Sequence, residues 1–307
     1  MDTGLISVLL PIYNEPIEWV KLSVESVLKQ TYRNIELITI IDNPERSDVI
    51  RWLRTIIDDR IVCVVNEKNL GIVYSLNKGI KLCHGEYVAR MDADDISVTT
   101  RFENQLAYII RKRCDIVGCN IATFSEMDST IHTSHYPKNL SAIKKYIIAG
   151  RGVPHPTWFV KKEVFDKLGG YRKIDYAEDY DFLIRAIVAG YRVGCVSDCC
   201  LRYRQNLSGI SQKNKGKQKY IAHIIQEQAK NGEMYSEEYI YARIAKEQKS
   251  IEVYSEYYQF SRKIRLLITD KDIAGIADVL KSVKIGYWGI LNSDIKRSLT
   301  LKLLELI

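Results

Sequence analysis

The N-terminal half of the chain alternates short apolar runs with longer amphipathic segments. The apolar runs are rich in Ile, Val and Leu and end in turn-forming residues, which predicts strands at 5–11, 35–41, 61–65 and 86–90. Between them, apolar residues recur at helical spacing with charges outside the stripe, which predicts helices at about 17–29, 46–58 and 73–83. Strands that alternate with helices predict an α/β fold with a largely parallel sheet.

Polar residues follow three of these predicted strands. Tyr13 and Asn14 come after the first strand, Asp42 comes after the second, and 92–95 comes after the fourth. Open sheets of this kind bind ligands beyond the carboxyl ends of their strands. We therefore expect these side chains to meet at one edge of the sheet and to form a nucleotide site there.

The run Met91-Asp92-Ala93-Asp94-Asp95 places three carboxylates within five residues. Carboxylates this close repel one another, so their burial is tolerable only if they face water or share a cation. Mg²⁺ and Mn²⁺ prefer oxygen ligands and are often held by one or two carboxylates together with substrate phosphates. The alternative is a solvated acidic turn in which Asp94 or Asp95 caps the next helix.

Several motifs, taken together and in order, resemble the family 2 glycosyltransferases of the GT-A fold. The resemblance extends from Ile6 to Tyr203 and includes segments 7–15, 26–32, 42–43, 69–71 with Asn77, 91–95, 155–156, 168–171 and 178–181. It implies a Rossmann-like, nucleotide-binding mixed sheet flanked by helices. It also implies transfer of a sugar from a nucleotide donor to an acceptor hydroxyl.

The resemblance implies a role for each residue of the nucleotide pocket. Pro11 and Tyr13 would flank the base, and Asn14 would lie at the edge of the pocket. Asp42 would accept a hydrogen bond from the base N3–H, which favours uracil. The family usually has two aspartates at this point, and this chain has Ile41 in the first position. The nucleotide-binding group is completed by Asn69 and Asp92.

The same resemblance implies a metal site and an acceptor side. Asp92 and Asp94 match the DxD motif of the family, with Asp94 as the direct ligand of Mn²⁺ or Mg²⁺. Asp95 would support the loop or contact the donor sugar. Glu178 and Asp179 match the acidic pair on the acceptor side, and Asp179 would be the catalytic base.

His155 would lie near the donor diphosphate or the acceptor, although a packed loop histidine is an equally good interpretation of its place between Pro154 and Pro156.

The chemistry of sugar transfer gives these residue types a physical reason. A nucleoside diphosphate leaves readily only when its charge is neutralised, and a divalent cation does this as a Lewis acid. A separate carboxylate takes the proton of the acceptor hydroxyl, which typically accelerates such reactions by ~10²–10⁴-fold. The alternative for Glu178, Asp179 and Asp181 is simple complementarity between acidic residues and a helix start.

Composition changes after about Ser211, where a basic segment leads into a Lys- and Tyr-rich region with helical periodicity. We predict a GT-A catalytic domain at 1–211, with a nucleotide-sugar-binding half at 1–95 and an acceptor-binding half at 96–211, followed by a helical region at 212–307. Helices are expected at about 220–231, 236–263, 270–284 and 295–306. The tail around Trp288 is expected either to pack on the catalytic domain or to contact anionic lipid.

The remaining composition restricts the class of protein. The net charge of +7 comes without a nucleic-acid-binding motif, so no nucleic-acid partner is expected. The seven cysteines are scattered and contain no CxxC pair, which predicts reduced thiols. No leader and no apolar span of ~18 residues is evident, so we expect a cytoplasmic protein, with peripheral contact at the inner face of the plasma membrane left open.

The sequence therefore predicts an inverting, metal-dependent glycosyltransferase. Its donor would be a UDP-sugar, and its acceptor a saccharide, either free or linked to a lipid diphosphate, in the synthesis of cell-surface polysaccharide. Two alternatives remain: a metal-dependent nucleotidyltransferase, and a non-catalytic sugar-nucleotide-binding protein of an assembly complex. The first would need a Gly- and Lys-rich phosphate loop, which 11–16 lacks. The second predicts a degraded site, whereas Asp92, Asp94 and Asp179 are all present.

Overall fold

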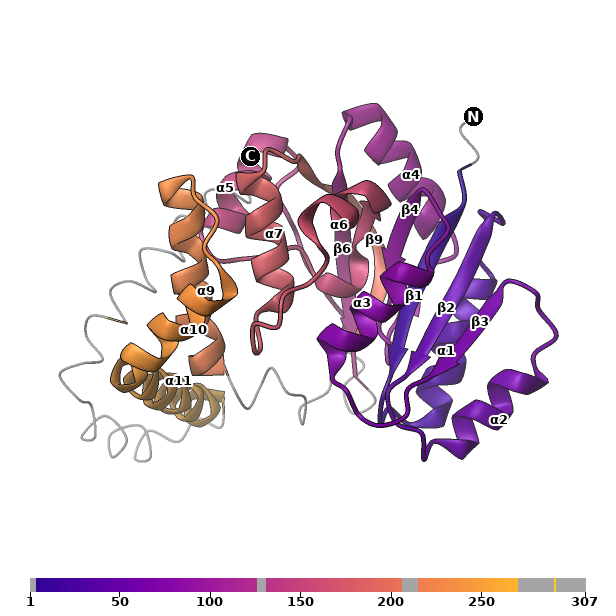
Figure 1. The fold of residues 1–307 in the computed structure, drawn as a ribbon, viewed down its shortest axis with the longest axis horizontal. Helices are drawn as coiled ribbons and strands as arrows, with labels where there is room; N and C mark the ends of the chain where they lie inside the picture. The colour runs from indigo at the N-terminus through magenta and orange to yellow at the C-terminus, as the bar shows by residue number, and fades with distance from the viewer. Residues whose placement is uncertain (1–3, 126–130, 206–214, 270–289, 291–307) are drawn as a thin grey trace.

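The computed structural model describes residues 4–125, 131–205, 215–269 and 290 (Figure 1). Within these ranges one nine-stranded sheet has the order β3-β2-β1-β4-β8-β6-β9-β5, and β7 pairs with β6 outside that path. The strands are β1 (Ile6–Ile12), β2 (Ile35–Ile41), β3 (Ile61–Val65), β4 (Tyr87–Arg90), β5 (Ile96–Ser97), β6 (Ile116–Phe124), β7 (His132–Thr133), β8 (Phe159–Lys161) and β9 (Val193–Arg204).

Helices connect and cover these strands. The first half contains α1 (Ile17–Leu28), α2 (Ser47–Thr55), α3 (Ile72–Leu82) and α4 (Arg101–Lys112). The second half contains α5 (Leu140–Ile148), the short 3₁₀ helix η1 (His155–Thr157), α6 (Lys162–Leu168) and α7 (Glu178–Val188). The C-terminal region contains α9 (Lys215–Asn231), α10 (Glu237–Lys246) and α11 (Gln248–Thr269).

The four strands of the N-terminal half are parallel, as predicted. β1 pairs with β2 and with β4, and β2 pairs with β3, all in parallel. β8 then runs antiparallel to both β4 and β6, which makes the whole sheet mixed. The carboxyl ends of β1, β2, β3 and β4 consequently lie on one edge, and this edge carries the polar residues singled out in the sequence.

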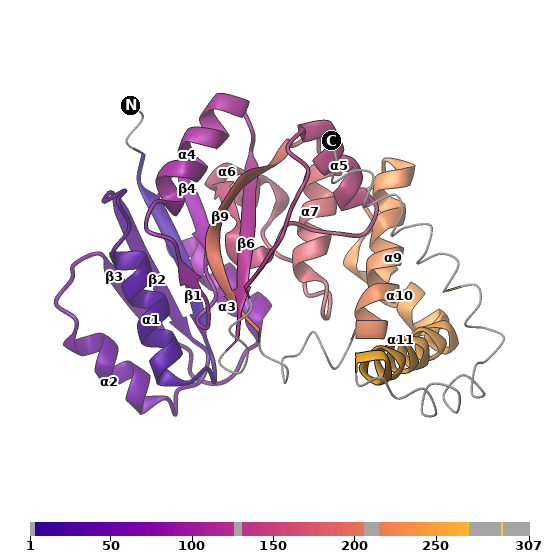
Figure 2. The same cartoon turned by 180° about the vertical axis from the view of Figure 1, so that it is seen from behind.

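Two hydrophobic clusters fill the two faces of the sheet, because successive residues of a strand point to opposite faces. Val8 and Leu10 of β1 belong to the cluster that packs under α1, α2 and α4. Leu9 belongs to the other cluster, which α3, α6 and α7 cover. Figure 1 is seen from the side of α3, α6 and α7, and Figure 2 from the side of α1 and α4.

One alternative and one expectation from the sequence are wrong. Neither Asp94 nor Asp95 caps a helix, since β5 follows them and α4 begins only after Thr100. The single helix expected at 236–263 is two helices, with a break at Glu247. No Gly or Pro marks this break, and it allows Ile240 of α10 and Ile251 of α11 to reach the same core.

The C-terminal helices belong to the core that α7 helps to build. Their apolar residues in this cluster are Ile221, Ile224, Ile225, Ile240 and Ile251, none more than 3% exposed. In both views α9 lies beside α7, and α10 and α11 lie farther from the sheet (Figures 1 and 2). The boundary at residue 211 stays a prediction, because the two regions share buried side chains.

The tail segments expected to be helical at 270–284 and 295–306 lie outside the described residues, as does Trp288. Ile290 is described, and it is buried against Tyr257 and Tyr258 of α11. Within the ranges given above, we find no helix with the length and apolarity needed to cross a lipid bilayer.

Candidate functional site

The polar edge of the sheet brings the predicted nucleotide residues together. The Asp42 amide donates to Ile12 O at 2.8 Å, and the Met91 amide donates to Leu9 O at 3.0 Å, so the three strand ends stay in register. Asn43 Nδ2 donates to Asn14 Oδ1 at 2.8 Å and joins the first two turns. Strand pairing alone therefore delivers these side chains to one place.

Asp42 is buried and holds the turn that follows β3. Its Oδ1 accepts from Asn66 Nδ2 at 2.7 Å and from the Leu70 amide at 2.9 Å, and its Oδ2 accepts from the Gly71 amide at 2.8 Å. Asn69 Oδ1 accepts from the same Gly71 amide at 3.0 Å. The turn has an open surface, because Leu70 is 37% exposed.

Pro11 and Tyr13 occupy different environments on the other side of this edge. Pro11 is buried inside β1, whereas the Tyr13 side chain is 42% exposed and its ring is available for stacking. The Tyr13 amide donates to Glu15 Oε2 at 2.7 Å, which fixes the turn. An exposed aromatic ring beside a buried carboxylate that accepts hydrogen bonds suits a planar base with an imide N–H.

The acidic cluster is compact and only partly exposed to water. One carboxylate oxygen from each of Asp92, Asp94 and Asp95 lies within 4.8 Å of the others. Asp95 is fully buried: its Oδ1 accepts from the Arg204 amide at 2.8 Å, and its Oδ2 has no hydrogen-bond partner. Asp92 Oδ1 pairs with Arg90 Nη2 at 2.5 Å.

The pKa values of Asp94, Asp95 and Glu15 are raised, as expected where nearby negative charges are buried and only partly compensated. Burial and then the Asp92 charge raise the pKa of Asp94 to about 7, and Glu15 adds to this shift. Burial raises the pKa of Asp95 well above its ordinary value, and it also raises the pKa of Glu15. Together with the unpartnered Asp95 Oδ2, these shifts show that the residues present fit a divalent cation.

The second acidic group begins α7. Glu178 and Asp179 are partly buried, and the Tyr180 amide donates to Asp179 Oδ1 at 2.6 Å. Burial and then the Asp179 charge raise the pKa of Glu178 to about 7, and burial raises the pKa of Asp179. The charges of Arg90 and Asp92 also act on Asp179, so the two acidic groups face one shared region.

His155 is buried among aromatic side chains, within reach of the charge of Arg90. Its Nε2 is 2.8 Å from the Tyr171 hydroxyl, and its ring meets the Trp158 ring edge-on with centroids 4.5 Å apart. Burial and then the charge of Arg90 lower the pKa of His155 well below its ordinary value, so the imidazole is neutral. His155 is thus a packed, neutral side chain, and its role in binding stays a prediction.

Asn77 ties α3 to the loop that follows α6. Its Nδ2 donates to Tyr171 O at 2.8 Å, and its Oδ1 accepts from the Tyr171 amide at 2.9 Å. The preceding Gly170 has φ +73°, and a Cβ there would lie 2.4 Å from Asn77 Oδ1. Gly170 is therefore required both for its backbone conformation and for this close approach.

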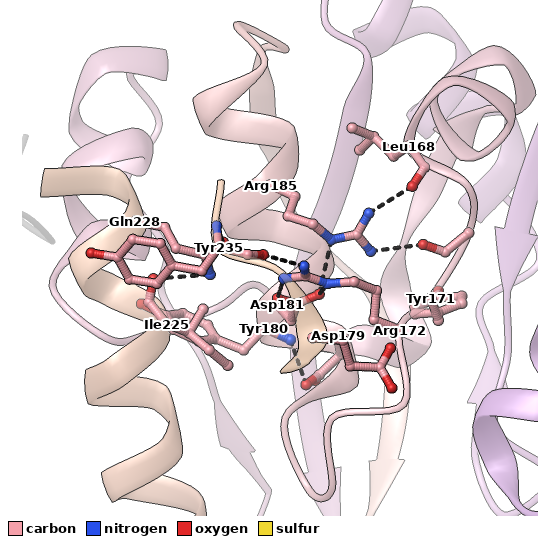
Figure 3. A network of polar contacts seen from close by, with 12 residues as sticks. Leu168, Tyr171, Arg172, Asp179, Tyr180, Asp181, Arg185, Ile225, Gln228 and Tyr235 are labelled. Atoms are coloured by element: carbon pink, nitrogen blue, oxygen red, sulfur yellow. Dashed lines mark hydrogen bonds and ion pairs between the residues drawn. The ribbon is translucent and has the colours of Figure 1, made fainter. Parts of the chain in front are cut away.

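A buried ionic network supports the loop before Asp179 (Figure 3). Asp181 is fully buried and accepts from Arg172 Nε at 2.9 Å and from Arg185 Nε at 2.9 Å. Arg185 also donates to Leu168 O at 2.8 Å and to Gly170 O at 2.7 Å. Arg172 reaches Tyr235 O, in the turn between α9 and α10.

Two more contacts join the C-terminal helices to this loop. Gln218 Nε2 of α9 donates to Tyr176 O at 2.9 Å, and the Tyr241 hydroxyl of α10 donates to Lys173 O. Tyr176 has φ +64°, a left-handed conformation that is uncommon for a residue with a side chain. The segment that leads to Glu178 and Asp179 is thus fixed by helices outside the sheet.

Sequence reasoning did not identify Arg90, Glu15 or Arg172 as parts of the site. Arg90 could have been found, since a basic residue ends an otherwise apolar strand directly before the acidic run. Glu15 stands in a motif that was recognised, yet no role was given to its side chain. Arg172 carries no local signal, because its partners Asp181 and Tyr235 come together only in the fold.

The mixed sheet and its acidic edge define the GT-A class of fold, and comparison with known proteins agrees. The structure of S. aureus TarS 1-349 in complex with UDP-GlcNAc matches with a TM-score of 0.61 at 16% identity, covering 98% of this chain and 90% of that chain. The uncharacterized glycosyltransferase MJ1057 of Methanocaldococcus jannaschii is 31% identical over 75% of this chain and 81% of its own length. The O-antigen biosynthesis glycosyltransferase WbnJ of Escherichia coli is 31% identical over 65% of this chain and 79% of its own length.

Residues 7–169 match the family described as "Glycosyl transferase family 2". The chain belongs to this family.

Proposed function

We propose that the protein transfers a sugar from a UDP-sugar to a saccharide hydroxyl with inversion of configuration, and that it requires Mg²⁺ or Mn²⁺. The observation that carries this proposal is the pair of acidic groups, Asp92–Asp95 and Glu178–Asp179, whose charges act on the same buried Arg90. One group suits a cation and a diphosphate, and the other suits the removal of a proton. The similarity to an O-antigen biosynthesis enzyme supports a cell-surface polysaccharide as the product.

The donor would bind along the carboxyl ends of β1, β2 and β4. Tyr13 would stack on uracil, Asn14 and Asn69 would line the pocket edge, and the Asp42 carboxylate would accept from the imide N3–H. Asp94 and Asp92 would hold the cation, which neutralises charge on the departing diphosphate. Asp95, with its unpartnered oxygen, would complete the donor side.

Asp179 would act as the base on the acceptor side. Its carboxylate takes the proton of the acceptor hydroxyl as that oxygen forms a bond to the anomeric carbon of the sugar. The bond between the anomeric carbon and the diphosphate oxygen breaks on the opposite face, so the configuration inverts. Glu178 and His155 would line the acceptor and donor-sugar side of the same region, with His155 neutral at physiological pH.

One experiment tests the reaction and the base together. Purified protein with Mn²⁺ and a saccharide acceptor mixture is given UDP-, GDP- and CMP-sugars, and nucleotide release is measured. We expect UDP release, and we expect Asp179→Asn to lower kcat ~10²-fold or more while the Kd for UDP stays near wild type. Asp166→Asn is the matched control, because Asp166 is an exposed residue paired only with Lys162. Full activity of Asp179→Asn, or a product that retains the donor configuration, would contradict the mechanism.

The same assay separates the alternative functions. A nucleotidyltransferase would release no UDP from a UDP-sugar and would release pyrophosphate when given a nucleoside triphosphate and a sugar phosphate instead. A non-catalytic binding protein would bind the nucleotide sugar and release nothing. Full activity in the presence of excess EDTA would contradict the proposed requirement for a metal.

We also propose that the tail brings the enzyme to an anionic membrane that carries a lipid-linked acceptor. The support is the basic and aromatic composition of 281–297. The full chain should then sediment with anionic liposomes, and a chain that ends at residue 279 should not. Equal sedimentation of the two chains would assign the tail to packing alone.

A further inference from the structure

Arg90, the last residue of β4, has more hydrogen-bonding capacity than the protein uses. The residue is only 6% exposed. Its Nη2 pairs with Asp92 Oδ1 at 2.5 Å, while its Nε and Nη1 are buried and have no hydrogen-bond partner. A buried N–H of a charged group that makes no hydrogen bond is costly, so a partner from outside the chain is expected.

Two other buried arginines show that the fold can satisfy such a group. Arg101 donates from Nε to Gln105 Oε1 at 2.9 Å and from Nη2 to Arg90 O at 2.8 Å, and its Nη1 lies 3.4 Å from Met91 Sδ. Arg185 donates from all three nitrogens as well. Among the side chains that the structure describes, Arg90 is the only arginine with buried nitrogens that lack a partner.

The surroundings of Arg90 indicate what the missing partner is. Its backbone is fixed, because the Arg90 amide donates to Trp158 O at 2.8 Å. Its charge acts on Asp92 and Asp95 of the cation group and on Glu178 and Asp179 of the acceptor group. In an inverting transfer, the group between the diphosphate and the base is the sugar itself.

We propose that the Nε–H and Nη1–H of Arg90 donate hydrogen bonds to hydroxyl oxygens of the sugar being transferred, which makes Arg90 a donor-sugar-binding residue. This inference rests on the proposed function. Sugar hydroxyls fit better than phosphoryl oxygens, because the Arg90 charge is already matched by Asp92 and the diphosphate has its own site at the cation. Two donors that point in different directions from one rigid, planar guanidinium would fix the orientation of the ring at two points, and hence the line of attack on the anomeric carbon.

The test separates the sugar from the rest of the donor. Calorimetry with Mn²⁺ compares UDP with UDP-glucose, UDP-galactose, UDP-N-acetylglucosamine and UDP-N-acetylgalactosamine, and the tightest of these four is carried forward. Arg90→Lys keeps a positive charge beside Asp92 and removes the Nε–H and Nη1–H donors of the planar guanidinium. We expect the Kd for UDP to stay within about twofold of wild type, and the Kd for the UDP-sugar to rise about tenfold through the loss of hydrogen bonds to a charged donor.

Arg101→Lys is the matched control. It removes a buried guanidinium whose nitrogens all have protein partners, so it should change both Kd values by the same factor. If Arg90→Lys does not fold, Arg90→Gln takes its place, because glutamine retains two N–H donors without the charge. The ratio of the Kd for the UDP-sugar to the Kd for UDP is then compared with that of the wild type.

Three results would overturn the inference. An equal loss of UDP and UDP-sugar affinity in Arg90→Lys would place the contact at the diphosphate. Unchanged affinities for both would show that Arg90 only balances the charge of Asp92. A wild-type protein that binds none of the four UDP-sugars would remove the proposed function as well, and this outcome is visible without any variant.

Discussion

A single residue, Asp42, serves both the fold and the proposed donor pocket. Its carboxylate holds Asn66, Leu70 and Gly71 through three hydrogen bonds, and it still offers lone pairs for a further donor. An alanine at this position would therefore damage the turn, so its effect on binding would be hard to interpret. Asparagine preserves the size of the side chain and removes the charge.

We expect Asp42→Asn to weaken UDP binding by about 1.5–3 kcal/mol, because the hydrogen bond to the uracil imide loses its charged acceptor. The discrimination between UDP and CDP should narrow, since cytosine has no N–H at position 3. Titration calorimetry with both nucleotides measures both effects. If the folded variant binds UDP as tightly as the wild type, Asp42 does not recognise the base.

The pair Glu178 and Asp179 predicts how activity depends on pH. A base must be deprotonated before it acts. Burial raises the pKa of both groups, and the charge of Asp179 adds to the shift of Glu178, whose pKa rises to about 7. The kcat should therefore be low in acid and rise to a plateau at a pH above the ordinary range of an aspartate, because the pKa of Asp179 is raised.

The Glu178→Gln variant tests the origin of this profile. It removes one negative charge beside Asp179, so the pKa of Asp179 should fall and the midpoint of the kcat profile should move to lower pH. Profiles of kcat against pH for wild type and Glu178→Gln supply the comparison. A midpoint that stays fixed or moves to higher pH would show that the two carboxyl groups do not titrate together.

The elements around the site show why the loop at 171–177 depends on distant parts of the chain. Gln218 of α9 and Tyr241 of α10 each hold a carbonyl of this loop, at Tyr176 and at Lys173. The left-handed backbone of Tyr176 costs on the order of 1–3 kcal/mol and persists only when its surroundings fix it. The C-terminal helices thus help to determine the position of Asp179.

The double variant Gln218→Ala/Tyr241→Phe should reduce kcat several-fold and leave the Kd for UDP unchanged. Stability should fall by about 1–3 kcal/mol, as expected for two lost hydrogen bonds. Tyr239→Phe is the control, because Tyr239 lies on the same helix, is exposed, and has its hydroxyl in contact with Arg243 of that helix. If kcat falls no further in the double variant than in the control, the helices support stability alone.

The elements of the N-terminal half could be predicted from sequence because their signals are local. β2 and β3 begin and end where their apolar runs do, and the parallel arrangement then places Asp42 and Asp92 on one edge. The break at Glu247 and the role of Arg172 could not be predicted, since both depend on packing between segments far apart in the chain. The two unpartnered nitrogens of Arg90 likewise exist only once β4 is buried.

At the scale of the whole molecule, the buried side chains of α9, α10 and α11 make the C-terminal region part of the catalytic core. Five of them are isoleucines from these helices in the cluster that α7 shares. Each fully buried side chain of this size contributes about 1.5–3 kcal/mol. Their sum is as large as the whole net stability of a typical domain, about 5–15 kcal/mol.

We therefore expect a chain that ends at residue 211 to aggregate or to lack a cooperative thermal transition. The full chain should unfold in one transition that includes the C-terminal helices. Calorimetry and circular dichroism of the two chains provide the measurement, and a chain shortened only to residue 279 serves as the comparison. A cooperative, UDP-binding fragment 1–211 would show that the two regions are independent.

The contact between Asn77 and Tyr171 has a consequence for recombination between related genes. Under the proposed division, a chimaera with the first 95 residues of a relative would combine the donor preference of the relative with the acceptor specificity of this protein. The segment from the relative must also supply an amide side chain at the position of Asn77, and the rest of the chain must keep Gly170. Otherwise the two hydrogen bonds between Asn77 and Tyr171 cannot form. Functional chimaeras should therefore be those in which this pair of positions is inherited as a unit.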